Sequence, residues 1–235
     1  MIAETVARIH ERIAEACARA HRRPEEVTLV GVGKTVAASR IAEAALAGVL
    51  DIGENYVQEM REKRALAADP RIRWHFIGHL QRNKVKVIAP WVHLVHAVDS
   101  PELALEIDRR ARASGRVVDV LVEVNTSEEE TRFGVRPARA PEVMARLAPL
   151  ENIRVLGLMT MGPFLPDPEA SRPAFRRLRL LARELESSSG GTILMRHLSM
   201  GMTGDFEVAV EEGATLVRIG TALFGARPQG GTTPA

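Results

Sequence analysis

Apolar residues recur along this chain with two different periods, and segments of the two kinds alternate. At the N-terminus the apolar positions are spaced three or four residues apart, which predicts an amphipathic helix whose polar face is exposed to solvent. After Pro24, short apolar runs are each followed by a longer stretch of helical pattern. A short apolar run bounded by turn residues is typical of a strand. The apolar positions of the first helix are Ile2, Val6, Ile9, Ile13 and Cys17.

Eight short runs after Pro24 are interpreted as strands. They are Val27–Val32, Val49–Ile52, Ile72–Ile77, Leu94–Val98, Val117–Val124, Val155–Met159, Ile193–Leu198 and Leu216–Ile219. The helical patterns between them include Ala37–Ala47, Val57–Ala67, Pro101–Ala113, Pro141–Leu147, Glu169–Glu186 and Phe206–Glu212. This alternation predicts parallel strands with right-handed crossovers, and eight such units predict a closed (β/α)8 TIM-type barrel, with an open doubly wound sheet as the alternative. We expect one domain over residues 1–229 and a disordered tail over 230–235.

The composition limits the partners of such a domain. Of the 235 residues, 46% are hydrophobic and 26% are charged, which is typical of a soluble globular protein with one core. The formal charge is +2, and no long block of one sign indicates nucleic acid or a membrane surface as a partner. A single cysteine, Cys17, excludes a disulfide within the chain and suits a buried position in a protein of the reducing cytoplasm. The first twenty residues carry charges throughout, unlike a signal peptide.

In a (β/α)8 barrel, binding and catalytic residues lie where the strands end and the loops to the following helices begin. Seven of the eight predicted strands end in small, polar or glycine residues. These ends are Gly33-Lys34-Thr35, Gly53-Glu54-Asn55-Tyr56, Gly78-His79-Leu80-Gln81, Asn125-Thr126-Ser127, Thr160-Met161-Gly162, Ser199-Met200-Gly201-Met202 and Gly220-Thr221.

Lysine is rare in this chain, so each lysine is informative. It occurs only at positions 34, 63, 84 and 86, whereas the other 28 basic residues are arginine. Arginine stays protonated, but a desolvated lysine can lose its proton and form an imine with an aldehyde. Lys34 directly follows the first strand and is therefore the candidate for such chemistry. Lys63 lies in a charged run and is predicted to be a solvated helix residue.

The segment around Lys34 also resembles the end of a nucleotide-binding P-loop. A P-loop requires a glycine five positions before the glycine that precedes the lysine, so that the backbone can wrap a phosphate. Thr28 occupies that position here, within a β-rich run. In addition, no strand end supplies an obvious aspartate of the kind that P-loop proteins use to hold the metal ion of the nucleotide (the Walker B aspartate). The P-loop interpretation is therefore rejected.

A phosphate site is predicted at the C-terminal strands. The segment Leu198–Asp205 brings a hydroxyl and two glycines to the start of a helix, and Gly220-Thr221 follows the last strand. Exposed backbone N–H groups at such positions attract phosphate, although glycine turns and hydroxyl caps are also common in loops. Arg218, within the last strand, requires a partner. That partner is either a carboxylate such as Asp51 or Glu54, or an aromatic nitrogen of a ligand.

Several histidines lie at or near the strand ends. His75 and His79, together with Glu54, are of the residue types that bind metal ions. Two histidines without a third placed ligand are weak evidence for a metal site, so polar packing is the favoured interpretation. The remaining histidines of the predicted strands are expected to be hydrogen-bonded structural residues. They are His93, His96 and His197.

Taken together, the motifs resemble those of the pyridoxal phosphate homeostasis proteins, and they occur in family order over nearly the whole chain. The resemblance implies a barrel like the N-terminal domain of alanine racemase, with pyridoxal 5′-phosphate (PLP) held as an internal aldimine on Lys34. It places Arg218 at the pyridine nitrogen, Asn55 in the pocket, and Ser199, Gly201, Gly220 and Thr221 around the phosphate. The motifs that carry it are Gly33-Lys34-Thr35, Gly53–Glu59, Trp74–Lys84, Gly157–Met161, Leu198–Met202 and Val217–Gly225.

Two positions depart from the family pattern. Gly33 stands where the family commonly has serine before the reactive lysine, which leaves the orientation of Lys34 open. Thr203 stands where the family commonly has serine, and it keeps the hydroxyl.

The resemblance implies a protein that stores or delivers PLP and keeps vitamin B6 and amino-acid pools in balance. Racemisation needs acid–base groups on both faces of the substrate, and this chain has one tyrosine, Tyr56, and no racemase-type C-terminal domain after its last strand. A carrier without catalysis is therefore expected, with a racemase-like PLP enzyme as the alternative. A monomer is favoured over a homodimer, and PLP-requiring apoenzymes are candidate partners.

Overall fold

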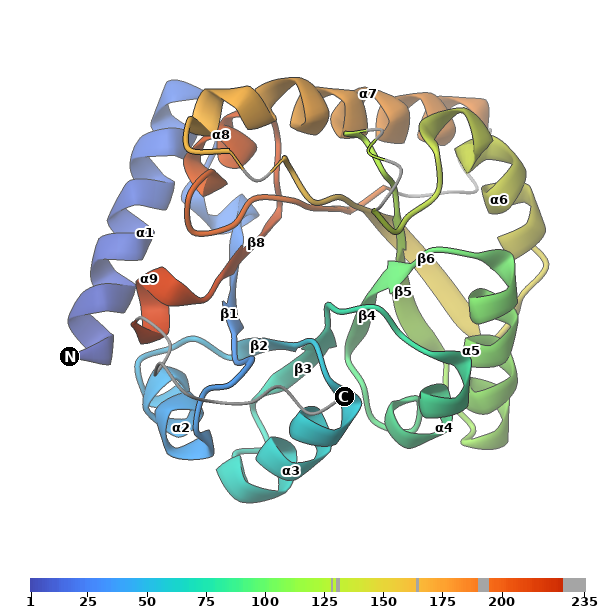
Figure 1. Ribbon diagram of the computed structural model, residues 1–235, viewed down its shortest axis with the longest axis horizontal. Helices are drawn as coiled ribbons and strands as arrows, with labels where there is room; N and C mark the ends of the chain where they lie inside the picture. The colour runs from blue at the N-terminus through green and yellow to red at the C-terminus, as the bar shows by residue number, and fades with distance from the viewer. Residues whose placement is uncertain (128, 130–131, 164, 190–194, 226–235) are drawn as a thin grey trace.

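The computed structural model is a closed barrel of eight parallel strands inside a ring of helices (Figure 1). It describes residues 1–127, 129, 132–163, 165–189 and 195–225. The strands follow one another around the barrel in chain order, and β1 (Thr28–Val32) pairs with both β2 (Asp51–Glu54) and β8 (Leu216–Ile219). This closure confirms the predicted (β/α)8 barrel and excludes the open sheet. The predicted tail, 230–235, lies outside the described residues.

The elements agree closely with the apolar pattern. Two predicted helices and two predicted strands match residue for residue, namely α3 (Val57–Ala67), α5 (Pro101–Ala113), β4 (Leu94–Val98) and β8. The remaining strands are β3 (Arg73–Phe76), β5 (Val118–Glu123), β6 (Ile153–Met159) and β7 (His197–Ser199). The other helices are α1 (Ile2–Arg19), α2 (Ala38–Leu46), α4 (Val85–Ile88), α6 (Ala140–Leu147), α7 (Arg172–Ser188), α8 (Phe206–Glu211) and α9 (Thr221–Phe224).

Some boundaries of the observed elements differ from the predicted boundaries, because of strand pairing or because the element is short. The second strand was predicted as Val49–Ile52, but β2 continues to Glu54 because its backbone pairs with β3 as far as Phe76. The start of the predicted strand Ile193–Leu198 lies partly outside the described residues, and β7 continues to Ser199. Helices α4 and α9 have four residues each and are too short to show a period.

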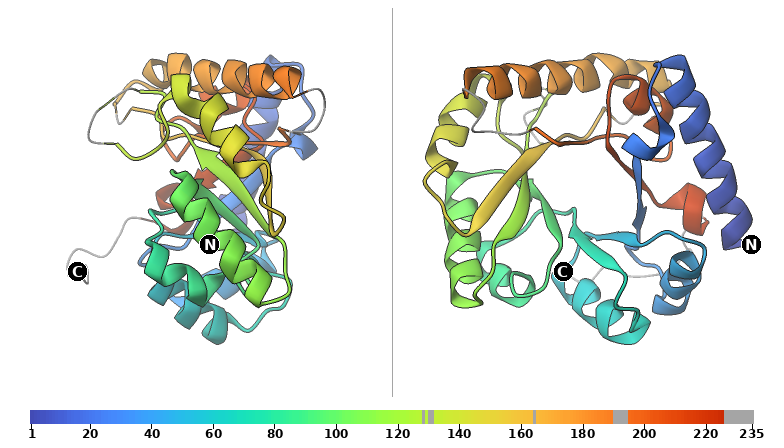
Figure 2. Two further views of the ribbon diagram at one scale, coloured as in Figure 1. Left: turned by 90° about the vertical axis from the view of Figure 1, so that its right-hand side faces the viewer. Right: turned by 180° about the vertical axis from the view of Figure 1, so that it is seen from behind.

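Helix α1 completes the outer layer of the barrel. The helix that follows β8 has only four residues, and α1 packs against it, against α8 and against α2 (Figures 1 and 2). All five of its predicted apolar positions are buried, including Cys17, whose thiol pKa is raised by burial. On its polar face, Arg12 and Arg19 form ion pairs with Glu207 and Glu211 of α8.

The barrel interior is layered. A separate apolar cluster that includes Val30, Leu121 and Leu216 fills its middle. Because alternate residues of a strand face the same side, Arg218 and Glu123, two positions beyond Leu216 and Leu121, also point inward. They lie one layer nearer the carboxyl ends of the strands, which form the barrel mouth.

Among the described residues, no helix combines the length and the apolar character needed to cross a lipid bilayer.

We expect Ile13→Ala to lower the free energy of unfolding by about 2–4 kcal/mol, because a large apolar side chain is removed from a closed core. Ile13 is only 1% exposed, between α1 and the barrel. Urea unfolding followed by circular dichroism measures the loss. Glu11→Ala, on the exposed face of the same helix, is the control and should change the value little; an equal loss in both variants would show that α1 does not pack as described.

Candidate functional site

A cavity of about 360 Å³ opens at the carboxyl ends of the strands, between β1, β2, β8 and the loops after β6 and β7. Five of the predicted site residues line it: Lys34, Asn55, Arg218, Gly220 and Thr221. A neighbouring cavity of about 310 Å³ also contains Lys34, so the lysine stands between the two. The barrel therefore brings together residues that are up to 187 positions apart in the chain.

The two remaining predicted residues, Ser199 and Gly201, lie beside this cavity rather than in its lining. The Ser199 side chain is fully buried, and its hydroxyl contacts Arg218 and His96. Gly201 has φ +90°, and a Cβ there would lie 2.5 Å from the Ala209 Cβ, so only glycine allows the loop after β7 to turn against α8. The hydroxyl residue of this loop that does line the cavity is Thr203.

The loop that carries Lys34 is anchored from behind by Lys63. The Lys63 ammonium donates to the Gly33 carbonyl at 2.7 Å, to Glu54 Oε1 at 2.7 Å and to Glu59 Oε2 at 2.6 Å. Glu59 Oε2 in turn accepts the N–H of Thr35 at 3.0 Å. Both peptide neighbours of Lys34 are thus held by one buried ion cluster, and Thr35 is held in the left-handed region at φ +63°.

The prediction that Lys63 is solvated was wrong. Its side chain is 10% exposed, because the face of α3 that carries it covers the first βα loop. A charged run in a sequence does not reveal which of its members faces a buried carboxylate. Burial raises the pKa of Glu54 to about 7 even though Lys63 opposes the shift, so the ion pair only partly offsets the desolvation of this carboxylate.

The same cluster explains the glycine that precedes Lys34. A Cβ on Gly33 would lie 2.6 Å from Glu54 Oε1, which is the oxygen that Lys63 holds. A serine at this position would have to displace the Glu54 carboxylate from its ion pair. Gly33 therefore accommodates the ion cluster, and the Lys34 side chain still reaches the cavity.

Arg218 is buried without an ion pair among the described residues. Its guanidinium donates to Ser199 Oγ at 2.5 Å and to the Thr160 carbonyl at 2.9 Å, and burial lowers its pKa to about 10. The expected carboxylate partners have other contacts: Asp51 accepts from Arg73 and His75, and Glu54 accepts from Lys63. The ion-pair interpretation of Arg218 was therefore wrong, and its remaining N–H groups are available to the cavity that it lines.

A chain of hydrogen bonds crosses the barrel interior from Arg218 to the opposite end. Ser199 Oγ lies 2.9 Å from His96 Nδ1, His96 Nε2 lies 2.9 Å from His75 Nδ1, and His75 Nε2 lies 2.9 Å from Asp51 Oδ1. Although burial opposes it, hydrogen bonds from Arg73 and His75 hold the pKa of Asp51 well below its usual range. Burial holds the pKa of His96 well below its usual range, so this imidazole is neutral.

The charges at the two ends limit the directions of the donors in this chain. The Asp51 carboxylate can only accept, so His75 donates to it from Nε2. We expect His75 Nδ1 to accept from His96 Nε2. His96 must then donate from Nε2 and accept on Nδ1, which requires the Ser199 hydroxyl to donate to it. The Ser199 oxygen is left with its lone pairs facing the Arg218 guanidinium. His75 and His96 therefore orient the group that holds Arg218.

His75 and His79 have different partners in the structure. His79 lies 3.2 Å from Asp99 and stacks on Phe133, away from His75. Within the described ranges, the one set of side chains with metal-ligand spacing is Asp51, His75 and His93. Both Asp51 oxygens already accept hydrogen bonds from Arg73, so a cation there would have to displace a guanidinium.

Comparison with known proteins identifies clear relatives. Residues 6–228 match the family model for the alanine racemase N-terminal domain. The pyridoxal phosphate homeostasis protein of Aquifex aeolicus is 48% identical over 224 residues, covering 95% of this chain and 97% of that protein. The pyridoxal phosphate homeostasis protein of Pseudomonas aeruginosa is 42% identical over 233 residues, covering 97% of each chain.

Solved structures give the same result. PipY of Synechococcus elongatus with PLP bound superposes with a TM-score of 0.83 and 34% identity, covering 96% of this chain and all of that one. An alanine racemase of Clostridium difficile superposes with a TM-score of 0.72 at 17% identity, covering 94% of this chain and 57% of the racemase. The latter similarity concerns the fold alone.

Removing the Lys63 ammonium should destabilise the protein. We expect Lys63→Met to lower the free energy of unfolding by about 3–5 kcal/mol, because Glu54 is left buried without its cation. The loss should grow from pH 5 to pH 8, since the pKa of Glu54 in the folded state lies above its unfolded value and folding then opposes its ionisation. Urea unfolding at both pH values is the measurement. The double variant Lys63→Met/Glu54→Gln should recover part of the loss, and no recovery would contradict the ion pair.

The donor order through the barrel predicts the proton positions on two histidines. We expect the ring ¹⁵N resonances of His75 and His96 to show a protonated Nε2 and an unprotonated Nδ1, because Asp51 accepts at one end and Arg218 donates at the other. The His96 signals should stay unchanged from pH 8 to pH 5, since its pKa lies well below the usual value. Assignment through His96→Gln identifies the signals. A titrating His96, or a proton on its Nδ1, would disprove this order.

Proposed function

Because the chain belongs to the pyridoxal phosphate homeostasis proteins, within the alanine racemase N-terminal domain family, we propose that it binds PLP at the barrel mouth for intracellular vitamin B6 and amino-acid homeostasis, without catalysing a reaction. The observation that carries the proposal is the placement of Lys34 in one cavity with Arg218 and two threonine hydroxyls. When bound, PLP supplies an aldehyde that condenses with primary amines and a ring that can accept electrons.

The residues of the cavity fit the functional groups of PLP. A primary amine at Lys34 suits the aldehyde, and the Arg218 guanidinium suits the ring nitrogen. With a guanidinium donating to it, that nitrogen stays unprotonated. Thr203, Gly220 and Thr221 provide hydroxyl and backbone donors for the phosphate.

Three further predicted residues act on the same site. We assign Asn55 to the wall of the cavity, where it lies on the loop after β2. We assign Ser199 a positioning role, because its hydroxyl already serves Arg218 and His96. Gly201 shapes the loop that presents Thr203 and accepts the backbone N–H of Arg218 at 3.0 Å.

Binding without turnover is supported by the relatives. The relatives from Aquifex aeolicus and Pseudomonas aeruginosa, each covered over 97% of its length, are named for pyridoxal phosphate homeostasis and not for a reaction. Tyr56, the single tyrosine of this chain, lies with its ring centroid 5.1 Å from Lys34 Nζ. We further propose that the protein works in the cytoplasm as a monomer and delivers PLP to apoenzymes that require it.

Mixing the purified protein with PLP should produce an absorbance band of a lysine–PLP adduct, and borohydride should fix it. We expect mass spectrometry to locate the reduced adduct at Lys34, and the band to be lost in Lys34→Ala, because this side chain supplies the amine in the cavity. Lys86→Ala removes an exposed lysine of α4 and serves as the control, with the band retained.

A band that survives Lys34→Ala, or an adduct located mainly at Lys63, Lys84 or Lys86, would overturn the assignment. The proposed absence of catalysis is tested by a separate experiment. The PLP-loaded protein should exchange the α-deuterium of amino acids no faster than free PLP, and faster exchange would favour the alternative of a PLP enzyme.

A further inference from the structure

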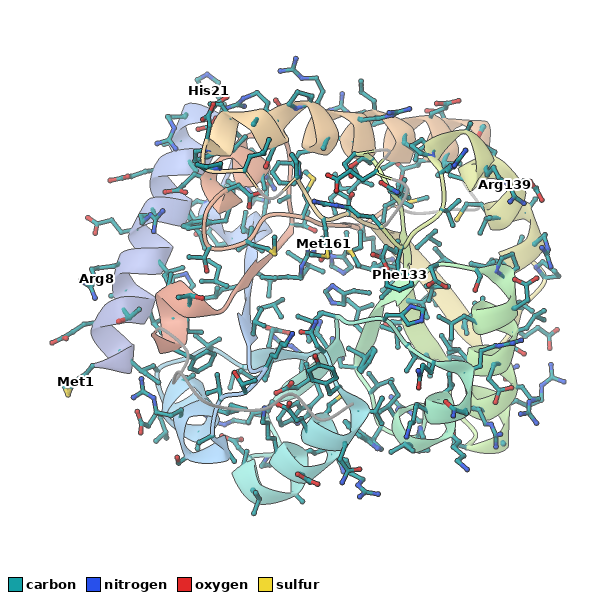
Figure 3. The ribbon with its side chains drawn as sticks, viewed as in Figure 1. Met1, Arg8, His21, Phe133, Arg139 and Met161 are labelled. Atoms are coloured by element: carbon teal, nitrogen blue, oxygen red, sulfur yellow. The ribbon has the colours of Figure 1, made fainter. Side chains whose placement is uncertain are left out.

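A second cavity of about 280 Å³ lies at the carboxyl ends of β5 and β6, beside the cavity that contains Lys34. Met161 lines both cavities and so forms the boundary between them. Figure 3 shows Met161 and Phe133 over the centre of the ring of helices. Their side chains are 44% and 60% exposed, so this part of the mouth offers apolar surface to a ligand.

Glu123, the last residue of β5, contributes its carboxylate to this cavity. The residue is only 8% exposed, and by strand alternation its side chain points into the barrel with that of Leu121. Over the described part of the chain, the Glu123 carboxylate has no hydrogen bond and no ion pair. A buried carboxylate without a donor is costly, and such a group in a cavity indicates a ligand that donates to it.

The other polar side chains of this cavity each have hydrogen-bond partners. Asn125 donates to the Glu129 carbonyl and accepts from Ser127. The Thr160 hydroxyl donates to the Val124 carbonyl. The Arg132 guanidinium donates to the Glu129 carboxylate and to two backbone carbonyls. Among the described polar side chains that line this cavity, Glu123 is therefore the one for which no side-chain hydrogen bond is formed.

The electrostatic surroundings favour a cation. Burial, with a smaller contribution from Asp99, raises the pKa of Glu123 to about 7, and only Arg218 acts in the opposite direction. A cation beside Glu123 would offset the desolvation of this carboxylate and its repulsion with the carboxylate of Asp99. Phe133 adds a ring, stacked on His79 at 4.1 Å, and aromatic rings attract ammonium groups.

We propose that this cavity binds the ammonium group of a small primary amine, such as a free amino acid, against the Glu123 carboxylate, with the carbon chain of the amine against Phe133 and Met161. The biological relevance rests on the proposed function, since primary amines are the compounds that condense with the aldehyde of PLP. A divalent cation is a poorer fit, because it requires three or more protein ligands and this cavity offers one free carboxylate.

Calorimetric titration of the PLP-free protein with ethylammonium chloride at pH 8 tests the proposal. Saturable binding is expected, and Glu123→Gln should weaken it at least tenfold because the amide carries no charge. Glu142→Gln alters an exposed carboxylate of α6 that is paired with Arg139, and it should leave the affinity unchanged. Ethanol, which has the same carbon chain without the charge, should not bind.

The Glu123→Gln variant is suited to this test because it should fold. Its side chain has nearly the same shape, and the substitution removes a buried carboxylate that has no partner among the described residues. We expect its free energy of unfolding at pH 8 to equal or exceed that of the unaltered protein. Equal ethylammonium affinity in both proteins, or no saturable binding in the unaltered protein, would overturn the proposal.

The affinity should also depend on pH. With a pKa of about 7, the ionised fraction of Glu123 rises from about one-tenth at pH 6 to about nine-tenths at pH 8, so ethylammonium should bind about tenfold more tightly at pH 8. The charged groups around this cavity also include Asp99 with its partner His79, Arg132 with its partner Glu129, and Arg218. Any pH dependence that they cause remains in Glu123→Gln and can be subtracted; an unchanged pH dependence in this variant would contradict the role of Glu123.

The ammonium site and the PLP site can fail independently. Lys34→Ala removes the amine proposed to hold PLP but none of the residues that line the second cavity. We expect this variant to bind ethylammonium with unaltered affinity. A protein that binds ethylammonium through Glu123 but forms no adduct with PLP would disprove the proposed function alone, and the converse result would disprove the ammonium site alone.

Discussion

The guanidinium of Arg218 is held inside the barrel by neutral oxygen atoms, and the polar interior is arranged around that fact. Taking a cation out of water is costly unless several acceptors surround it. Here the acceptors are Ser199 Oγ and the Thr160 carbonyl, while the nearest negative charge in the same hydrogen-bonded chain is Asp51, at the far end. Two histidines connect the two ends, and Ser199 Oγ contacts both His96 and the arginine.

A different buried cation organises the other side of the mouth. Lys63 reaches the loop of Lys34 from the outside of the barrel and holds it through Gly33 and, by way of Glu59, through Thr35. The backbone on both sides of Lys34 and the guanidinium of Arg218 are thus held by contacts that lie outside the cavity. Such pre-organisation means that little ordering is needed when a ligand arrives.

The mouth has an uneven distribution of charge. Lys34 and Arg218 make the side near β1 and β8 basic, whereas Glu123 and Asp99 make the side near β4 and β5 acidic. An anionic cofactor suits the first side and an ammonium group suits the second. Met161 lies between them, so the two proposed ligands would meet at a shared wall.

The barrel can be predicted from the amino-acid sequence alone, because the periods of apolar residues are local properties and eight alternating units close in only a few ways. The sequence also singled out Lys34, since lysine is scarce in this chain. Only the tertiary structure decided the partners of the buried polar groups. His96 and Ser199 are 103 positions apart, Lys63 contacts a carboxylate of the strand that precedes its helix, and Glu123 ends the apolar strand β5. Whether such groups are solvated, paired or free depends on which distant segments pack against them, and no local pattern records that.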